Sequence, residues 1–211
     1  MNDILLNILV LVVLTLLGGL AFLLLRRRNT QREGKLIQLA AEKGWKYEAV
    51  REPLQWGFRL TSTRWTLEAL SISSGGDPSP GSSNISIHTT WQAAAPGSTL
   101  LLGERRSTAN LGESGERLTR AVLQFALGSD AEGLGEVIAG SDAFRRQYML
   151  WAQDPQSFRL SPAIESILLN WKGAKPLIKR TSSGLTVELR SVHLKEPAAI
   201  LALVQLGELL L

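Results

Sequence analysis

An uninterrupted apolar run, Ile4–Leu25, constrains this chain more than any other feature of its sequence. The run carries no charged residue, and Asn7 and Thr15 are its only clearly polar members. At about 1.5 Å of rise per residue, a helix of this length covers roughly 33 Å, which is enough for the hydrocarbon core of a bilayer. The run therefore predicts a transmembrane helix over residues 4–25, preceded by a short tail at residues 1–3.

The charges on either side of this run predict whether it is cleaved and how it is oriented in the membrane. Asp3 precedes the run, no Lys or Arg does, and Arg26, Arg27 and Arg28 follow it. A cleaved signal peptide has the opposite polarity and a shorter apolar core, so we predict an uncleaved signal-anchor. Basic flanks stay on the cytoplasmic side, which predicts an N-terminus outside and a cytoplasmic domain in the cell membrane. The three arginines are predicted to anchor this flank beside anionic lipid headgroups.

The distribution of charge argues against nucleic acid as a partner. The formal net charge is +4, but residues 26–46 alone hold seven basic and two acidic residues. The 16 basic and 16 acidic residues of the remaining segment, 47–211, cancel. A nucleic-acid-binding domain needs a basic face of its own, because phosphate neutralisation supplies much of the affinity.

Residues 26–46 are predicted to form a basic juxtamembrane helix or linker, and residues 47–211 one soluble domain. The chain has no cysteine, which excludes disulfides, thiolate catalysis and cysteine-ligated metal centres.

Hydrophobic periodicity predicts an α+β fold for this domain, with a mainly antiparallel sheet of about six to seven strands and four to five helices. Alternating patterns predict strands over residues 56–61, 65–73, 85–91, 99–102, 176–180 and 185–192. Helical spacing predicts helices over residues 32–43, 116–127, 161–171 and from 197 to the end, with a weaker one within 128–140. Residues 144–152 fit a helix or a strand, and their aromatic content with the following Asp154-Pro155 turn favours a strand. Residues 74–84 contain only turn formers and loop residues, so we expect an exposed loop there.

Two further patterns concern the arrangement of these elements. The final helix is apolar nearly all round and short for a membrane span, so it is either buried or a contact with a protein partner or a second copy. Residues 61–68 (TSTRWTLE) resemble residues 181–188 (TSSGLTVE), and each stretch follows a helix and a Pro-Leu pair. The similarity is consistent with two helix-plus-hairpin halves, although hairpins reuse these residue types.

No set of residues in the sequence forms a catalytic, cofactor or metal signature. His88 and His193 are the only histidines, and neither has a carboxylate at ligand spacing. Gly112-Glu113-Ser114-Gly115 lacks the closing glycine of a nucleophile elbow, and Gly133-Leu134-Gly135 lacks the third glycine of a dinucleotide fingerprint. We therefore predict no catalytic residues, no metal site and no cofactor.

The tryptophans are the remaining candidates for a binding role. The six are Trp45, Trp56, Trp65, Trp91, Trp151 and Trp171. They are able to line an apolar or carbohydrate-binding cleft, but most fall at positions that face inward from a strand or helix. Core packing is therefore the favoured interpretation.

Three stretches resemble a known family: WGFRLTSTRWTLEAL (56–70), FRRQYMLWAQDP (144–155) and SPAIESILLNW (161–171). On these residues the chain resembles uncharacterised bacterial single-pass membrane-anchored proteins with an α+β domain of unknown function. The resemblance implies the fold and the tether, and it implies no activity.

Three functional hypotheses follow from the sequence. The leading one is a non-enzymatic scaffold or interaction domain tethered to the cytoplasmic face of the membrane. The second is a domain that senses a lipid or an apolar ligand through its tryptophans. The third is an enzyme with an unrecognised site.

Overall fold

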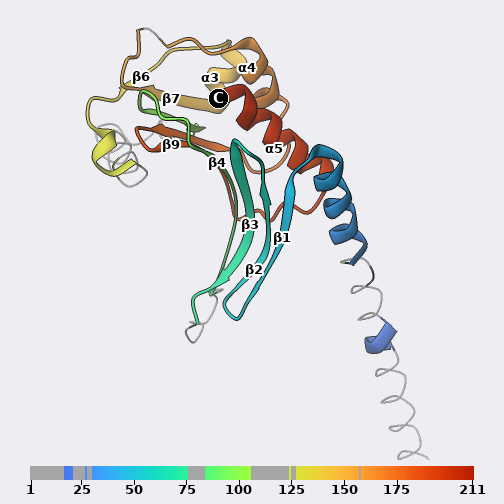
Figure 1. Cartoon of the computed structure of the whole chain (residues 1–211). Coiled ribbons are helices and arrows are strands. Elements are labelled where there is room, and N and C mark those ends of the chain that lie inside the picture. The colour runs from blue at the N-terminus through green and yellow to red at the C-terminus, as the bar shows by residue number, and fades with distance from the viewer. Residues whose placement is uncertain are drawn as a thin grey trace, which may run out of the picture.

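The domain is built on one nine-stranded antiparallel sheet (Figure 1). The computed structural model describes residues 17–20, 27, 30–75, 84–105, 124, 127–156 and 158–211. The strand order across the sheet is β1-β2-β3-β4-β9-β8-β5-β7-β6. The strands are β1 (Lys46–Glu52), β2 (Gln55–Thr61), β3 (Trp65–Ser73), β4 (Ile85–Ala93), β5 (Leu100–Glu104), β6 (Gly135–Glu136), β7 (Tyr148–Ala152), β8 (Leu177–Thr181) and β9 (Gly184–Arg190).

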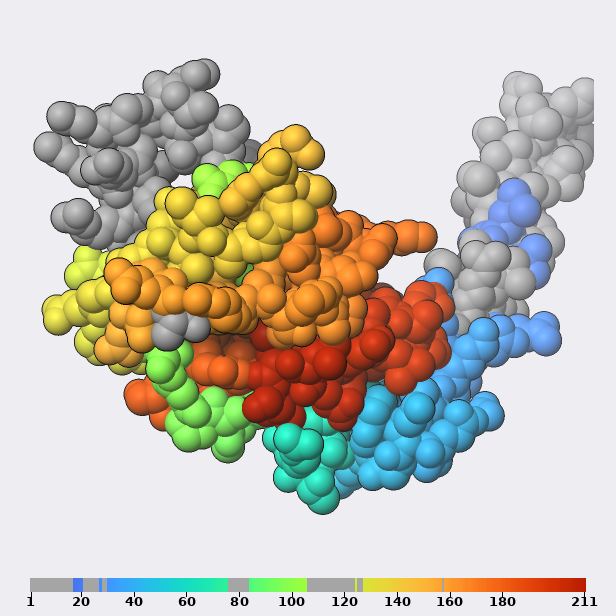
Figure 2. Space-filling view, turned by 90° about the horizontal axis from the view of Figure 1, so that it is seen from above, coloured from blue at the N-terminus to red at the C-terminus, as the bar shows by residue number. Residues whose placement is uncertain are grey.

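Helices cover one face of this sheet. Residues 30–43 form a helix that ends at Gly44, whose φ of 69° is the left-handed conformation that suits a helix C-terminus. The later helices are α3 (Asp142–Gln147), α4 (Pro162–Leu169) and α5 (Pro197–Leu210), and Gly128–Ala131 forms a 3₁₀ turn, η1. In the space-filling view, α5 (red) lies between the orange segment that contains α4 and the blue segment that contains residues 30–43 (Figure 2).

The main core lies between these helices and the inner face of the sheet. Residues alternate between the two faces of a strand, so each strand contributes every second side chain to the core. One row of paired residues crosses five adjacent strands and is almost fully buried: Leu60, Leu67, Trp91, Val187 and Ile178. From the helices, Leu36, Ala40, Leu168, Ile200 and Leu203 close over this face.

A smaller apolar cluster lies on the opposite face, at the β5–β7 end of the sheet. Leu101 and Trp151 pack there with Leu127, next to Leu134 and Met149. This end of the outer face is therefore covered by the segment around η1.

Most predicted elements are confirmed. The predicted helices at residues 32–43 and 161–171 and at the C-terminus all form, and so do the six predicted strands, each within a few residues of its expected bounds. The final helix is buried through Ile200, Leu203, Val204, Leu206 and Gly207, which is the first of its two predicted placements.

Three predictions need correction. The sheet has nine strands rather than six or seven. The weak helix predicted within residues 128–140 is wrong, because that segment forms η1 and the two-residue strand β6. Residues 144–152 contain both predicted alternatives, since α3 ends at Gln147 and β7 begins at Tyr148.

Three predicted segments fall largely outside the described residues, and the predicted tail at residues 1–3 does so entirely. Of the predicted loop at 74–84, residues 76–83 lie outside them. Only residues 17–20 of the predicted span at 4–25 are described, and they are helical. Of the predicted helix at 116–127, residues 124 and 127 are described and helical. Within the described part of the chain, no helix has the length and apolar character needed to cross a bilayer.

Candidate functional site

The uncovered part of the outer sheet face carries two adjacent rows of polar side chains, which we call the polar face. The first row crosses five strands through Glu48, Arg59, Glu68, Thr90 and Glu188. The second crosses six strands through Lys46, Thr61, Thr66, Gln92, Thr186 and Lys179. Strand alternation places both rows opposite the described helices, and all of their side chains are partly or fully exposed.

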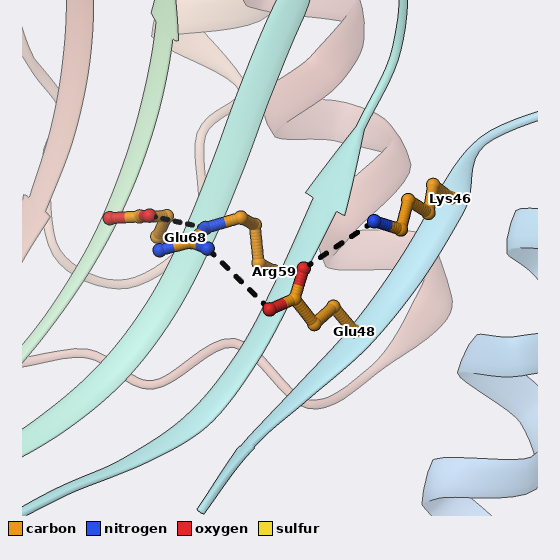
Figure 3. A network of polar contacts seen from close by, with 4 residues as sticks. All are labelled: Lys46, Glu48, Arg59 and Glu68. Carbon is orange, nitrogen blue, oxygen red and sulfur yellow. Dashed lines mark hydrogen bonds and ion pairs between the residues drawn. The ribbon is translucent and has the colours of Figure 1, made fainter. Parts of the chain in front are cut away.

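Four residues of β1, β2 and β3 form an ion-pair network on this face (Figure 3). Arg59 Nε donates to Glu68 Oε1 at 2.6 Å, and Arg59 Nη1 lies 3.7 Å from Glu48 Oε1. Lys46 Nζ is 3.8 Å from Glu48 Oε2. The hydrogen bond to Glu68 and the charge of that carboxylate raise the pKa of the Arg59 guanidinium above its ordinary value. Arg59 therefore stays cationic and joins the side chains of three strands.

A second network lies on the other side of β4. Glu188 on β9 pairs with Lys179 of β8 at 3.4 Å and with Arg190 at 3.1 Å. The two networks correspond in the repeated sequence pattern, because Glu68 and Glu188 occupy the same position in the similar stretches 61–68 and 181–188. The structure places these stretches on β3 and β9, where both glutamates are the register partners of Thr90 in β4.

A shallow hollow of about 450 Å³ opens at one end of the polar face. It lies between the β2–β3 and β8–β9 turns, which are the turns of the two similar stretches. Its polar lining consists of Ser62, Thr63, Arg64, Thr66, Gln92, Ser183 and Thr186. The lining has several hydroxyl groups, one amide and one guanidinium but no carboxylate, and Arg64 makes no ion pair with any described residue. Such a lining suits a neutral polar or acidic group of a partner.

His193 contacts a serine, but the pair does not form a nucleophilic site. Its Nδ1 lies 3.2 Å from the Oγ of Ser71 on β3. Burial, and then the neighbouring charge of Lys195, lower the pKa of His193. Ser71 is only 4% exposed, so a substrate carbonyl has no path to its hydroxyl. His88, on β4, lies in the register between Leu70 and Arg190, away from this pair.

The described residues bring together no group of three or more metal-ligating side chains. Gly133 and Leu134 belong to the connection between η1 and β6, and Gly135 begins β6. They do not open a helix, which a dinucleotide site requires. Residues 112–115 lie outside the described part of the chain.

The tryptophans do not line a common cleft. Trp65 and Trp91 are buried in the main core, and Trp151 is buried in the smaller cluster. Trp45 packs edge-on against Trp65 with ring centroids 4.9 Å apart, and Trp171 packs at the rim of the core. Core packing is therefore confirmed for these five, and Trp56 is the exception with an exposed side chain.

The predicted basic flank is described only at Arg27, which is helical and exposed, and Arg26 and Arg28 lie outside the described residues. The sequence alone did not predict the hollow or the place of Arg64 in its lining. The one related feature of the sequence was the similarity of residues 61–68 and 181–188. That similarity does not predict that β3 and β9 pair with the same strand, β4, which brings the two turns together. In comparisons with protein-family models, with curated proteins and with solved structures, nothing matches this chain.

Proposed function

We propose that the chain is a single-pass membrane-anchored interaction domain, held on the cytoplasmic side, that binds a partner through its polar face. The partner is a protein segment that presents acidic or neutral polar groups. No catalytic step is part of this proposal. The observation that carries it is the hollow between the two hairpin turns, where the cationic Arg64 has no acidic counterpart among the described residues.

The charge arrangement of the polar face supports a specific rather than a general electrostatic contact. Its charges are of both signs, and those in the two networks are already paired with one another. Exposed pairs of this kind contribute little affinity but penalise partners whose charges are misplaced. Arg64 differs from them because it makes no ion pair with any described residue, and its guanidinium suits a bidentate contact with a partner carboxylate.

The membrane tether of the proposal rests on the sequence. The apolar run at 4–25 has the length of a span, and Arg26, Arg27 and Arg28 favour retention of the domain in the cytoplasm. A tethered domain meets membrane-bound partners at a raised effective concentration, so a modest contact area is sufficient for function.

Site-specific photocrosslinking in cells tests the interaction. A photoreactive residue in place of Gln92 faces the hollow, and the same residue in place of Glu132 serves as a surface control. We expect a discrete adduct from position 92 but not from position 132. We expect Arg64→Glu to abolish that adduct, while Lys172→Glu, a matched charge reversal at an exposed site outside the hollow, leaves it unchanged. The proposal is wrong if position 92 gives no adduct, or if both charge reversals have the same effect.

A further inference from the structure

Four apolar side chains are exposed together at one end of the four-stranded part of the sheet. They are Leu54 (53% exposed), Trp56 (40%), Ile85 (44%) and Ile87 (37%), and we call them the apolar tip. Leu54 lies in the β1–β2 turn, and Trp56 is the second residue of β2. Ile85 and Ile87 begin β4, where Ile87 pairs with Ser71 and Ser71 with Trp56 in one row. An exposed apolar cluster with a tryptophan is typical of a surface that contacts a membrane or another protein.

Chain geometry places this tip at the level where the predicted anchor ends. The helix at 30–43 rises about 20 Å, and β1 returns about the same distance in the opposite direction. Side-chain contacts confirm the return, because Arg51 near the end of β1 donates to Glu33 in the first turn of the helix at 2.9 Å. Figure 1 shows the free end of the β1–β2 hairpin and the start of this helix pointing to the same side of the domain.

The position of the predicted membrane span identifies the occupant. The span ends at residue 25 and the arginines at 26–28 follow it, so the start of the helix at 30–43 lies within a few residues of the headgroup region. The apolar tip lies level with this start and therefore faces the same membrane surface. Tryptophan prefers the membrane–water interface. The Arg51 side chain beside it is paired with Glu33 and is 74% exposed.

We infer that the apolar tip is a second membrane contact, which inserts Leu54, Trp56, Ile85 and Ile87 into the interfacial layer of the bilayer that anchors the chain. The inference rests on the membrane tether of the proposed function. Two contacts with the same bilayer restrict the tilt of the domain. The hollow is at the opposite end of the strands, so this tilt points the hollow away from the membrane.

Single-cysteine labelling of the full chain in phospholipid vesicles tests this contact. The chain has no native cysteine, so each engineered one is labelled alone. Three variants carry an environment-sensitive fluorophore: Leu14→Cys in the predicted span, Leu54→Cys at the apolar tip and Ser182→Cys in the exposed β8–β9 turn. The vesicles contain phosphatidylcholine and phosphatidylglycerol, with or without lipids that carry a quencher at a shallow depth.

We expect blue-shifted emission and strong lipid quenching at positions 14 and 54, and neither at position 182. Quenching at 14 but not at 54 overturns the tip contact and leaves the tether standing. A blue shift at 54 without lipid quenching also overturns it and indicates a second copy or another protein surface on the tip. Equal quenching at 54 and 182 contradicts the inferred tilt. No quenching at 14 refutes the tether itself, and the inference with it.

Discussion

At the residue scale, a glycine of α5 packs directly against the central tryptophan of the sheet. Trp91 on β4 is fully buried, and Gly207 of α5 lies directly against its indole ring. A Cβ on Gly207 would lie 2.4 Å from Cε2 of Trp91. The glycine is therefore required by packing, and the large ring has no space to move because protein interiors are close-packed.

Gly207→Ala is predicted to destabilise the domain. We expect the free energy of unfolding to fall by about 1–3 kcal/mol, which is typical of overpacking a core. Gly34→Ala is the matched control, since Gly34 is also helical but has open space around its Cβ position. That control is expected to raise the free energy of unfolding by about 0.5–1 kcal/mol. Chemical denaturation measures both, and equal signs for the two variants would contradict the packing described.

His193 is predicted to make stability depend on pH. Burial lowers its pKa below the ordinary value of 6.5, so the unfolded chain binds the proton at a higher pH than the folded chain does. The free energy of unfolding should therefore be highest above about pH 6.5 and decrease as the pH falls below that value. His193→Gln, which still offers a polar group to Ser71, should weaken this decrease, and denaturation at several pH values measures it. An unchanged pH profile in the variant would contradict burial as the cause.

At the element scale, α4 is fixed to the sheet through a buried hydroxyl group. Tyr148 on β7 donates from its Oη to the carbonyl oxygen of Leu168 at 2.8 Å, and its ring stacks on Phe144 of α3 with centroids 5.1 Å apart. Burial raises the pKa of Tyr148, so this hydroxyl remains a donor at neutral pH. One residue thus connects β7, α3 and the end of α4.

Tyr148→Phe is predicted to lower the free energy of unfolding by about 0.5–1.5 kcal/mol, because it removes a buried hydrogen bond to the carbonyl oxygen of Leu168 and leaves that oxygen with its backbone donor, the Trp171 amide at 3.2 Å. Tyr47→Phe is the control, since that hydroxyl is only partly buried and its bond to Glu33 is longer, at 3.3 Å. We expect a clearly smaller loss there. Thermal unfolding compares the two, and a larger loss for Tyr47→Phe would mean that Tyr148 does not hold α4.

The ion pairs of the polar face are predicted to contribute modestly. A double-mutant cycle on Arg59→Gln and Glu68→Gln should give a coupling energy of about 0.2–1 kcal/mol that weakens with added salt. The Lys179–Glu188 pair is longer, at 3.4 Å against 2.6 Å, and should couple less. A coupling that salt does not change would show that the Arg59–Glu68 pair is shielded from solvent, contrary to the described face.

Local patterns predicted the elements whose periodicity is strong. The alternation around Phe58, Leu60 and Leu67 located the β2–β3 hairpin, and the helical spacing of Ile164 and Leu168 located α4. The two-residue strand β6 has no periodicity of its own and forms through pairing with β7, so it was missed. Residues 144–152 satisfy helical and strand spacing at once, and the switch at Tyr148 depends on its tertiary partners.

The candidate site was hidden from the sequence for a different reason. The hollow combines residues from three segments that are far apart in the chain, namely the turns at 62–64 and 182–184 and the end of β4. The contact between Ser71 and His193 likewise joins residues 122 positions apart. Only the strand order β3-β4-β9 brings these groups together, and no local pattern specifies that order.

At the scale of the whole molecule, the sheet carries an apolar surface at one end of its strands and a polar hollow at the other. The apolar tip lies at one end of β2, β3 and β4, and the hollow lies at the other. A strand of nine residues, the length of β3, spans about 30 Å. In the proposed arrangement, the tether and the tip hold one end at the membrane, and the sheet presents the hollow toward the cytoplasm at this distance.

A topology measurement decides whether the domain is tethered to the membrane on its cytoplasmic side. Ser182→Cys provides a single thiol in the exposed turn beside the hollow, in a chain without native cysteine. Spheroplasts that express the full chain are treated with a membrane-impermeant maleimide, before and after permeabilisation. We expect the protein to stay in the membrane fraction and position 182 to be labelled only after permeabilisation. Labelling in sealed spheroplasts, or recovery of the chain in the soluble fraction, would contradict this topology.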